Sequence, residues 1–169
     1  DGSVLYVKVG KEFADHKSVD HSQEEYVRYE PTGIVHNNSA ESYFSVFKRG
    51  MKWMMTFQCK DGGWAAFDRD CTNNILEKVP FADHNAMLDP ECADITARIL
   101  ELLGHEKVDV ENPQVQKALQ YIREQQEEDG SWYGRWGVNY IYGTWQVLRG
   151  LRAMNVNMNQ KRLLKARAW

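Results

Sequence analysis

The sequence predicts an all-α protein that forms an arc of an α/α barrel, or toroid. Apolar residues recur at helical spacing in successive segments, and no strand pattern follows Gly10. One helix-and-turn pattern also occurs twice, since Gln58-Cys-Lys-Asp-Gly-Gly-Trp64 returns in the same register as Gln126-Glu-Glu-Asp-Gly-Ser-Trp132. Repetition of a whole unit is typical of repeat architectures, and two such units form an arc that cannot close into a ring.

Each repeat is expected to be a helix that ends in an Asp-Gly pair, because glycine accepts the left-handed conformation that terminates many helices. The planar amide of the Gln, Gln58 or Gln126, is predicted to lie against the indole that follows the turn. The same amide can bond a backbone group of the neighbouring helix. The two indoles are those of Trp64 and Trp132. These four residues would tie one helical hairpin to the next.

Both copies of the repeat open with a basic and a small residue, Arg49-Gly50 in the first and Lys117-Ala118 in the second. The stretch Leu164–Trp169 has the same pattern, so we expect a third unit to start there. The sequence also begins with Asp1 and not with Met. We therefore expect a chain that is incomplete at both ends.

The chain is expected to divide into an unassigned, loop-rich segment at 1–40 and a partial barrel domain at 41–169. In the first segment Val4–Val9 alternates like a short strand, whereas Pro31, Gly33 and Asn37-Asn38 indicate loop.

Four helices are predicted after Ala40, near 41–58, 90–103, 113–126 and 140–153. Asp89-Pro90 and Asn112-Pro113 predict two helix starts, each with a capping residue and a first-turn proline. The apolar stripe of the first helix, expected to face a core, comprises Phe44, Phe47, Met51, Met54 and Met55. The stripe of the second helix, which should stop at Gly104, comprises Ile95, Ile99, Leu102 and Leu103.

The composition fits one folded domain, with 169 residues of which 43% are hydrophobic and 27% charged. A net charge of -3 argues against general attraction to nucleic acid. No apolar run approaches the ~20 residues that a membrane-spanning helix needs, and no signal peptide is recognised. Cys59, Cys71 and Cys92 are odd in number and form no Cys-x-x-Cys pair, which favours a reducing, cytoplasmic compartment.

Four motifs in order resemble the squalene–hopene cyclase branch of the triterpene cyclases, over about Glu41 to Trp169. They are Gly62–Asp68, Pro80–His84, Asp94–Arg98 and Gly134–Thr144. The resemblance implies a terpene cyclase, an isomerase that converts squalene to hopanoids by proton-initiated cationic polycyclisation. It implies no cofactor and no metal site.

The resemblance also implies roles for individual residues. Phe67, Trp136 and Tyr142 match aromatic residues that line the cavity, where π faces stabilise cations by ~2 kcal/mol or more each. Asp94 and Arg98, one helical turn apart, match a polar network that supports the catalytic acid. The family's proton donor lies in an Asp-x-Asp-Asp-Thr-Ala motif that this sequence does not contain. We therefore expect this segment to be inactive on its own.

Two alternatives stay open at this point. A protein prenyltransferase β subunit would need a zinc site of Asp, Cys and His, and no such cluster is evident in the sequence. A non-catalytic helical-repeat scaffold would have no enclosed apolar cavity. The resemblance further implies peripheral association with the inner face of a bacterial membrane, and homodimers of the full-length proteins.

Overall fold

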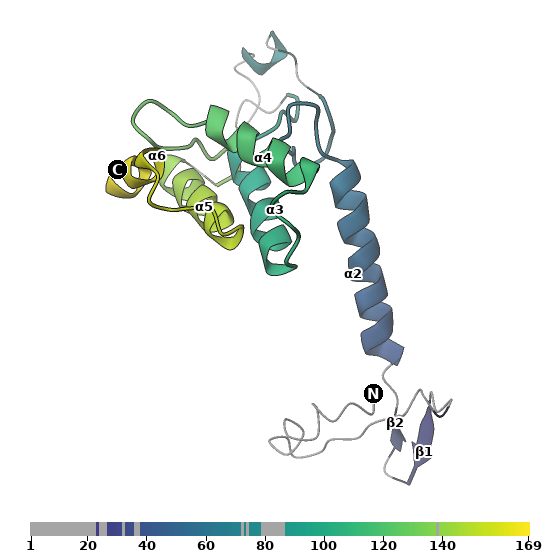
Figure 1. Cartoon of the computed structure of the whole chain (residues 1–169). Coiled ribbons are helices and arrows are strands. Elements are labelled where there is room, and N and C mark those ends of the chain that lie inside the picture. The colour runs from purple at the N-terminus through teal and green to yellow at the C-terminus, as the bar shows by residue number, and fades with distance from the viewer. Residues whose placement is uncertain are drawn as a thin grey trace. The chain divides into compact units, whose positions relative to one another are not determined.

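The computed structural model describes residues 23, 27–31, 33–35, 38–71, 73, 75–78, 87–137 and 139–169. Past Ala40 the described residues contain helices and no strand, so the predicted all-α class is confirmed (Figure 1). The chain divides into two units, Asp1–Trp53 and Met54–Trp169, each described by itself below. Its helices are α2 (Asn38–Thr56), α3 (Ala93–His105), α4 (Pro113–Glu124), α5 (Tyr140–Ala153), α6 (Lys161–Ala168) and the short 3-10 helix η2 (Leu76–Lys78).

The first unit contains a small antiparallel hairpin that the sequence did not predict. Strand β1 (Arg28–Glu30) pairs with β2 (Gly33–Val35), and Tyr29 lies opposite Ile34. The expectation of loop was wrong for Gly33, which lies in β2, and for Asn38, which begins α2. An aromatic and a β-branched residue facing each other favour pairing across the turn. The strand expected at Val4–Val9 lies outside the described residues.

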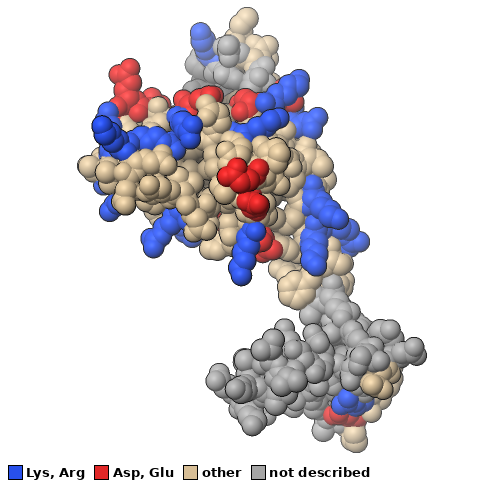
Figure 2. All heavy atoms as spheres, in the orientation of Figure 1, with Lys and Arg blue, Asp and Glu red and all other residues tan. Residues whose placement is uncertain are grey.

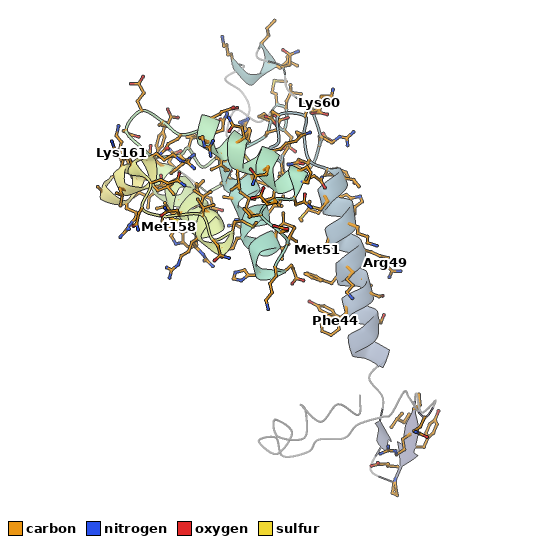
Figure 3. All side chains as sticks on the ribbon, viewed as in Figure 1. Phe44, Arg49, Met51, Lys60, Met158 and Lys161 are labelled. Atoms are coloured by element: carbon orange, nitrogen blue, oxygen red, sulfur yellow. The ribbon has the colours of Figure 1, made fainter. Side chains whose placement is uncertain are left out.

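The predicted range of the first helix was 41–58. Helix α2 begins three residues earlier, at Asn38, and ends two residues earlier, at Thr56. Figure 3 shows Phe44 and Met51 on the side of α2 opposite Arg49, as the helical spacing predicts. The expected burial of this stripe was wrong, because Phe44 is 58% exposed and Met51 is only half-buried. Helical periodicity identifies an apolar face, but it does not show that this chain itself covers that face.

In the second unit, α3 and α5 pack most closely, through small residues. A Cβ at Gly150 would overlap the carbonyl oxygen of Ala97, and one at Gly104 would lie 2.5 Å from the carbonyl carbon of Ala153. In the predicted apolar stripe of α3, Leu103 is buried, whereas Ile95 and the other two residues are half-buried. The largest fully buried apolar side chains are Trp64, Trp132, Leu100, Leu103, Ile122, Leu151, Leu163, Val115 and Val147.

Helices α4 and α5 begin where the sequence predicted. Asn112 caps α4, because its side chain accepts a hydrogen bond from the Gln114 N–H at 2.9 Å and Pro113 occupies the first helical position. On the face drawn in Figure 2, the acidic and basic side chains of the second unit are interspersed. No helix in the described ranges is both long and apolar enough to span a bilayer.

Candidate active site

The first repeat turn is held by two side chains. The Gln58 amide donates to the carbonyl oxygens of Gly62 at 2.9 Å and of Gln114 at 2.8 Å. Since Gln114 lies in the first turn of α4, this amide joins the turn to the next helix of the repeat. The buried indole of Trp64 donates to the carbonyl oxygen of Met54 at 3.0 Å and so ties the turn back to the end of α2.

The second repeat turn has the same bonds. The Gln126 amide donates to the carbonyl oxygens of Gly130 at 2.8 Å and of Arg162, in the first turn of α6, at 3.1 Å. The indole of Trp132 donates to the carbonyl oxygen of Ile122 at 2.8 Å. The predicted bond from each amide to a neighbouring helix is thus present, whereas stacking of the amide on the indole stays a prediction.

A threonine hydroxyl completes each turn. The backbone N–H of Trp64 donates to Thr96 on α3 at 2.9 Å, and that of Trp132 donates to Thr144 on α5 at 3.0 Å. Both hydroxyls are buried. The two repeats therefore share their hydrogen bonds and not only their residue types, which supports a common structural unit.

The Asp-Gly pairs act differently from the helix ends that the sequence predicted. Helices α2 and α4 stop two residues before Gln58 and Gln126, at Thr56 and Glu124. The glycines close the tight turns that follow, with φ of 100° at Gly62 and 101° at Gly130. A short turn is favoured here because the preceding aspartate accepts a bond from the N–H two residues on, at 2.9 Å in both copies.

These equivalent aspartates have pKa values shifted in opposite directions. Burial raises the pKa of Asp61 above its ordinary value, although the hydrogen bond from the Gly63 N–H acts in the opposite direction. At Asp129 the Ser131 hydroxyl, 2.6 Å from the carboxylate, and the Ser131 N–H hold the pKa below its ordinary value. The difference has two causes: burial disfavours the charged carboxylate of Asp61, and the hydroxyl of Ser131, which stands where the first repeat has glycine, favours that of Asp129.

The structure brings Phe67 and Trp136 together, although they are far apart in the sequence. Their ring centroids are 5.9 Å apart at an interplanar angle of 84°, an edge-to-face contact. Phe67 is 73% exposed and Trp136 is half-buried. Two of the three predicted cavity aromatics therefore form one aromatic pair that is open to solvent in this chain.

Two buried carboxylates hold the main chain of this pair. Asp89 accepts from the N–H groups of Ala66 at 3.1 Å, Asp68 at 2.8 Å and Phe67 between them. Asp94, with no exposed surface, accepts from the Trp136 N–H at 3.0 Å. Among the described residues, the other Asp94 oxygen, Oδ1, has no hydrogen-bond partner.

Asp89 is the site residue that the sequence interpretation missed. We predicted that Asp89-Pro90 starts α3, but α3 begins at Ala93 after Cys92, whose side chain makes no capping bond. The Asp89 carboxylate is turned instead toward 66–68, on the far side of a long connection. An aspartate that precedes a helix usually caps it. The sequence does not show that three backbone N–H groups of a distant segment bond to Asp89 instead.

Asp94 and Arg98 lie one helical turn apart on α3, but no ion pair joins these two described residues. Arg98 instead donates to the hydroxyl of Tyr142 on α5, and its guanidinium carbon lies 5.5 Å from the centroid of the Tyr142 ring. A Cβ at Gly134 would lie 2.8 Å from that ring. Gly134 and Gly137 thus leave room for the Tyr142 ring, while Asp94 turns to Trp136.

One group of described residues has the composition of a metal site. Cys59, Asp70 and Glu91 place ligand atoms within 4.8 Å of one another. However, burial raises the pKa of the Cys59 thiol to about 12, whereas metals bind the thiolate. Asp70 already accepts from the Lys60 N–H at 2.8 Å and lies 3.7 Å from the Arg69 guanidinium. The geometry favours a protonated thiol in a structural cluster.

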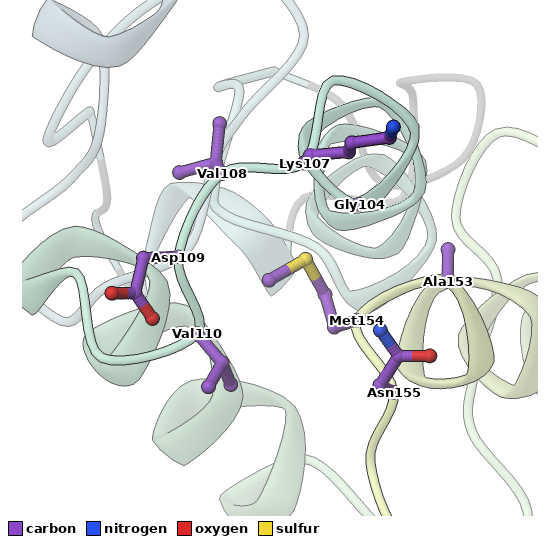
Figure 4. A pocket seen from close by; sticks show the side chains of 8 residues that line it. All are labelled: Gly104, Lys107, Val108, Asp109, Val110, Ala153, Met154 and Asn155. Carbon is purple, nitrogen blue, oxygen red and sulfur yellow. The ribbon is translucent and has the colours of Figure 1, made fainter.

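A separate pocket of about 350 Å³ lies where α3 and α5 end (Figure 4). Both helices end with a residue in the left-handed conformation nearby, Lys107 after α3 and Asn155 after α5. The pocket contains none of the site residues discussed above. It is lined by Gly104, Lys107, Val108, Asp109, Val110, Ala153, Met154 and Asn155.

The repeated turns define a helical-repeat protein, and the buried carboxylates that hold an aromatic pair agree with its resemblance to the terpene cyclases. The family profile of the squalene-hopene cyclase C-terminal domain matches residues 20–169. The chain belongs to the squalene–hopene cyclase family. This membership removes the prenyltransferase β-subunit alternative, and the match begins within the segment at 1–40 that the sequence left unassigned.

The relatives agree with this family. The chain is 43% identical over 123 residues to a squalene-hopene cyclase of Schizosaccharomyces japonicus, covering 73% of this chain and 19% of the relative. It is 42% identical over 121 residues to a squalene–hopene cyclase of Zymomonas mobilis, covering 72% and 18%. It is 40% identical over 115 residues to a sporulenol synthase of Bacillus subtilis, covering 67% and 18%. The chain thus spans about a fifth of the length of these relatives.

Proposed function

We propose that this chain forms part of the cavity wall of a triterpene cyclase that converts squalene to hopanoids by proton-initiated polycyclisation. The observation that carries the proposal is the Phe67–Trp136 pair, two rings in edge-to-face contact whose main chains are held by buried carboxylates. Aromatic rings stabilise carbocations by their π electrons and carry no nucleophile that would trap them. The boundary at residue 41 between this wall and the preceding segment is part of the proposal.

Phe67, Trp136 and Tyr142 share the task of stabilising cations in this proposal. In a desolvated site, each ring would contribute about 2 kcal/mol or more to a cation over its face. Asp94 and Arg98 act as supporting residues. Asp94 has one carboxylate oxygen without a partner among the described residues, which leaves it able to accept a bond from the acid's polar network. Arg98 acts through the Tyr142 hydroxyl.

The chain alone is proposed to be inactive toward squalene. Its Phe67 ring is 73% exposed, so water would reach a cation formed beside it. Solvent exclusion is needed because water adds to such cations before the rings have closed. The Asp-x-Asp-Asp-Thr-Ala motif, which would supply the proton, is not in the sequence.

The same proposal extends to location and assembly. Squalene is insoluble in water, so we propose that the complete cyclase binds peripherally to the cytoplasmic face of a bacterial membrane and forms homodimers. Flotation with liposomes tests the first part and light scattering in detergent tests the second. A complete cyclase that stays in the aqueous fraction, or that is monomeric, would contradict the corresponding part.

A chimaera tests the function directly. Residues 41–169 replace the aligned segment of the Zymomonas mobilis cyclase, and the purified protein is incubated with squalene. We expect cyclised products by mass spectrometry, fewer of them after Trp136→Ala, and a larger share of incompletely cyclised ones. A chimaera that folds and gives none would favour the non-catalytic scaffold. The 169-residue chain, run beside it, should give no product above the blank without protein.

A further inference from the structure

Asp89 has a larger number of backbone partners than its place before a helix explains. Asp89 is buried, with 8% of the residue exposed, and its carboxylate accepts three consecutive N–H groups, those of Ala66, Phe67 and Asp68. These donors belong to an irregular segment with no regular bonding of its own. A charged acceptor strengthens such bonds to about twice the strength of neutral ones.

The three bonds surround the backbone of Phe67. The direction in which the Phe67 ring points is set by the main chain of residues 66–68, because its own side chain is mostly in solvent and has few neighbours to hold it. Its ring nevertheless meets the Trp136 ring edge to face at 5.9 Å. A mostly exposed ring needs a rigid backbone to keep such a contact.

The other ring is held in the same manner. Asp94 lies at the start of α3, shortly after Asp89, and accepts from the Trp136 N–H at 3.0 Å. The short stretch from Asp89 to Asp94 therefore holds the main chains of both aromatic residues. The distance between the two rings therefore depends on the positions of Asp89 and Asp94 as well as on the side-chain conformations of Phe67 and Trp136.

We propose that Asp89 is a positioning residue: its carboxylate clamps the backbone of residues 66–68 and so sets the placement of the Phe67 ring against Trp136. Asp89 touches no reacting atom in this arrangement. The inference deepens the proposed function, and rests on it only for the effect on products. The clamp itself is a property of the folded chain.

The test compares Asp89→Asn with wild type in the full 169-residue chain, kept monodisperse in a mild non-ionic detergent. Asparagine keeps the shape but turns one acceptor into a donor that faces N–H groups. We expect the amides of residues 66–68 to exchange hydrogen at least about tenfold faster, as the loss of bonds to a charged acceptor requires. Asp89→Glu, which keeps both acceptors, should exchange more slowly than Asp89→Asn.

A spectroscopic readout follows the ring contact. The chain is labelled with 5-fluorotryptophan, and the Trp136 resonance is assigned by its loss in Trp136→Phe. Phe67→Leu should shift this resonance, and Asp89→Asn should shift it in the same direction, while Trp64 and Trp132 keep their positions and report an intact fold. Asp109→Asn is the matched control, because among the described residues that exposed carboxylate accepts only from the Glu111 N–H, at 3.0 Å.

Equal exchange at residues 66–68 in all three proteins would overturn the clamp. A Trp136 resonance that shifts in Phe67→Leu but not in Asp89→Asn would also overturn the clamp. A Trp136 resonance that shifts in neither variant would overturn it as well. If Asp89→Asn loses the fold signals, the comparison is made with Asp89→Glu, where the displaced carboxylate should still shift the Trp136 resonance.

Products of the chimaera separate the two proposals. If Phe67→Ala changes the products and Asp89→Asn does not, the clamp fails and the proposed function stands. If the fluorine shift is present but Phe67→Ala leaves the products unchanged, the proposed function fails and the clamp stands.

Discussion

Gly62 and Gly130 hold equivalent positions in the two repeat turns, and both need a conformation that other residues rarely adopt. Their φ values are 100° and 101°. A Cβ at Gly62 would also lie 2.5 Å from the carbonyl oxygen of Lys117 on α4. The backbone conformation and the close approach of α4 therefore both require glycine at position 62.

Gly62→Ala is expected to lower the free energy of unfolding by at least about 2 kcal/mol, from the left-handed strain and the clash together. Gly50→Ala is the matched control. Gly50 lies inside α2 with nothing within 4 Å of a new Cβ, so alanine there should be neutral or stabilise by up to about 1 kcal/mol. Urea denaturation measures both, and equal effects of the two substitutions would contradict the account of the turn.

The Cys59 thiol predicts how stability changes in alkali. Burial raises its pKa to about 12 from an ordinary value of 9.0, so between these values the unfolded chain loses a proton that the folded chain keeps. The contribution of Cys59 is therefore complete below pH 9 and is lost as the pH rises toward 12.

Cys59→Ala should make the fall in urea midpoint between pH 8 and pH 10.5 shallower, whatever it does to the stability at pH 8. Cys71→Ala, which removes a half-buried cysteine from a surface segment, is the control and should leave the slope unchanged. Identical slopes in wild type and Cys59→Ala would show that the thiol is not held protonated by burial.

At the scale of the helices, the start of α4 was predictable because local chemistry determines it, whereas α5 begins at the predicted residue although Asn139 before it makes no side-chain capping bond. Asn112 followed by Pro113 caps α4 whatever packs around it. The start of α3 was not predictable, since Asp89 is used by a distant segment. The α3–α5 contact was not predictable either. Ala97 and Gly150 add nothing to the hydrophobic periodicity, and they allow the contact because their small size lets the two backbones approach closely.

Gln126 joins its turn to α6, so Gln126→Ala should cost about 1–3 kcal/mol, from two hydrogen bonds and a part-buried site. The amides of α6 should exchange faster in the variant. Gln120→Ala is the matched control, because Gln120 is exposed on α4 and, within the part of the chain that the structure describes, bonds only Glu124 and Arg123 on its own helix. A loss no greater than that of Gln120→Ala would show that the amide does not join the elements.

At the scale of the second unit, large apolar side chains remain in solvent. Ile141 is 79% exposed, Phe67 73% and Trp145 49%. Exposed apolar groups of this kind promote association. The motifs that carry the resemblance pointed to Phe67 and Trp136, but not to their edge-to-face contact, because the sequence does not encode the distance across a long connection.

We expect the chain to self-associate in water and to become monomeric in non-ionic detergent, as measured by light scattering after gel filtration. Ile141→Lys and Trp145→Lys together should reduce association without changing the helix content by circular dichroism. Leu164→Lys, at a 45% exposed position on α6, tests whether any added charge has this effect. A monomer in water at high protein concentration would contradict the expectation.

The two glutamine bridges span different lengths of chain, and this difference sets an order of events. The partners of the bond from Gln58 to Gln114 are 56 residues apart in the sequence, and those of the bond from Gln126 to Arg162 are 36 apart. Closing the longer loop costs about 0.4 kcal/mol more in chain entropy. The tryptophan-to-threonine bonds differ in the same sense, with separations of 32 and 12 residues. The C-terminal repeat should therefore form first during folding, and the segment that carries Phe67 should be ordered last.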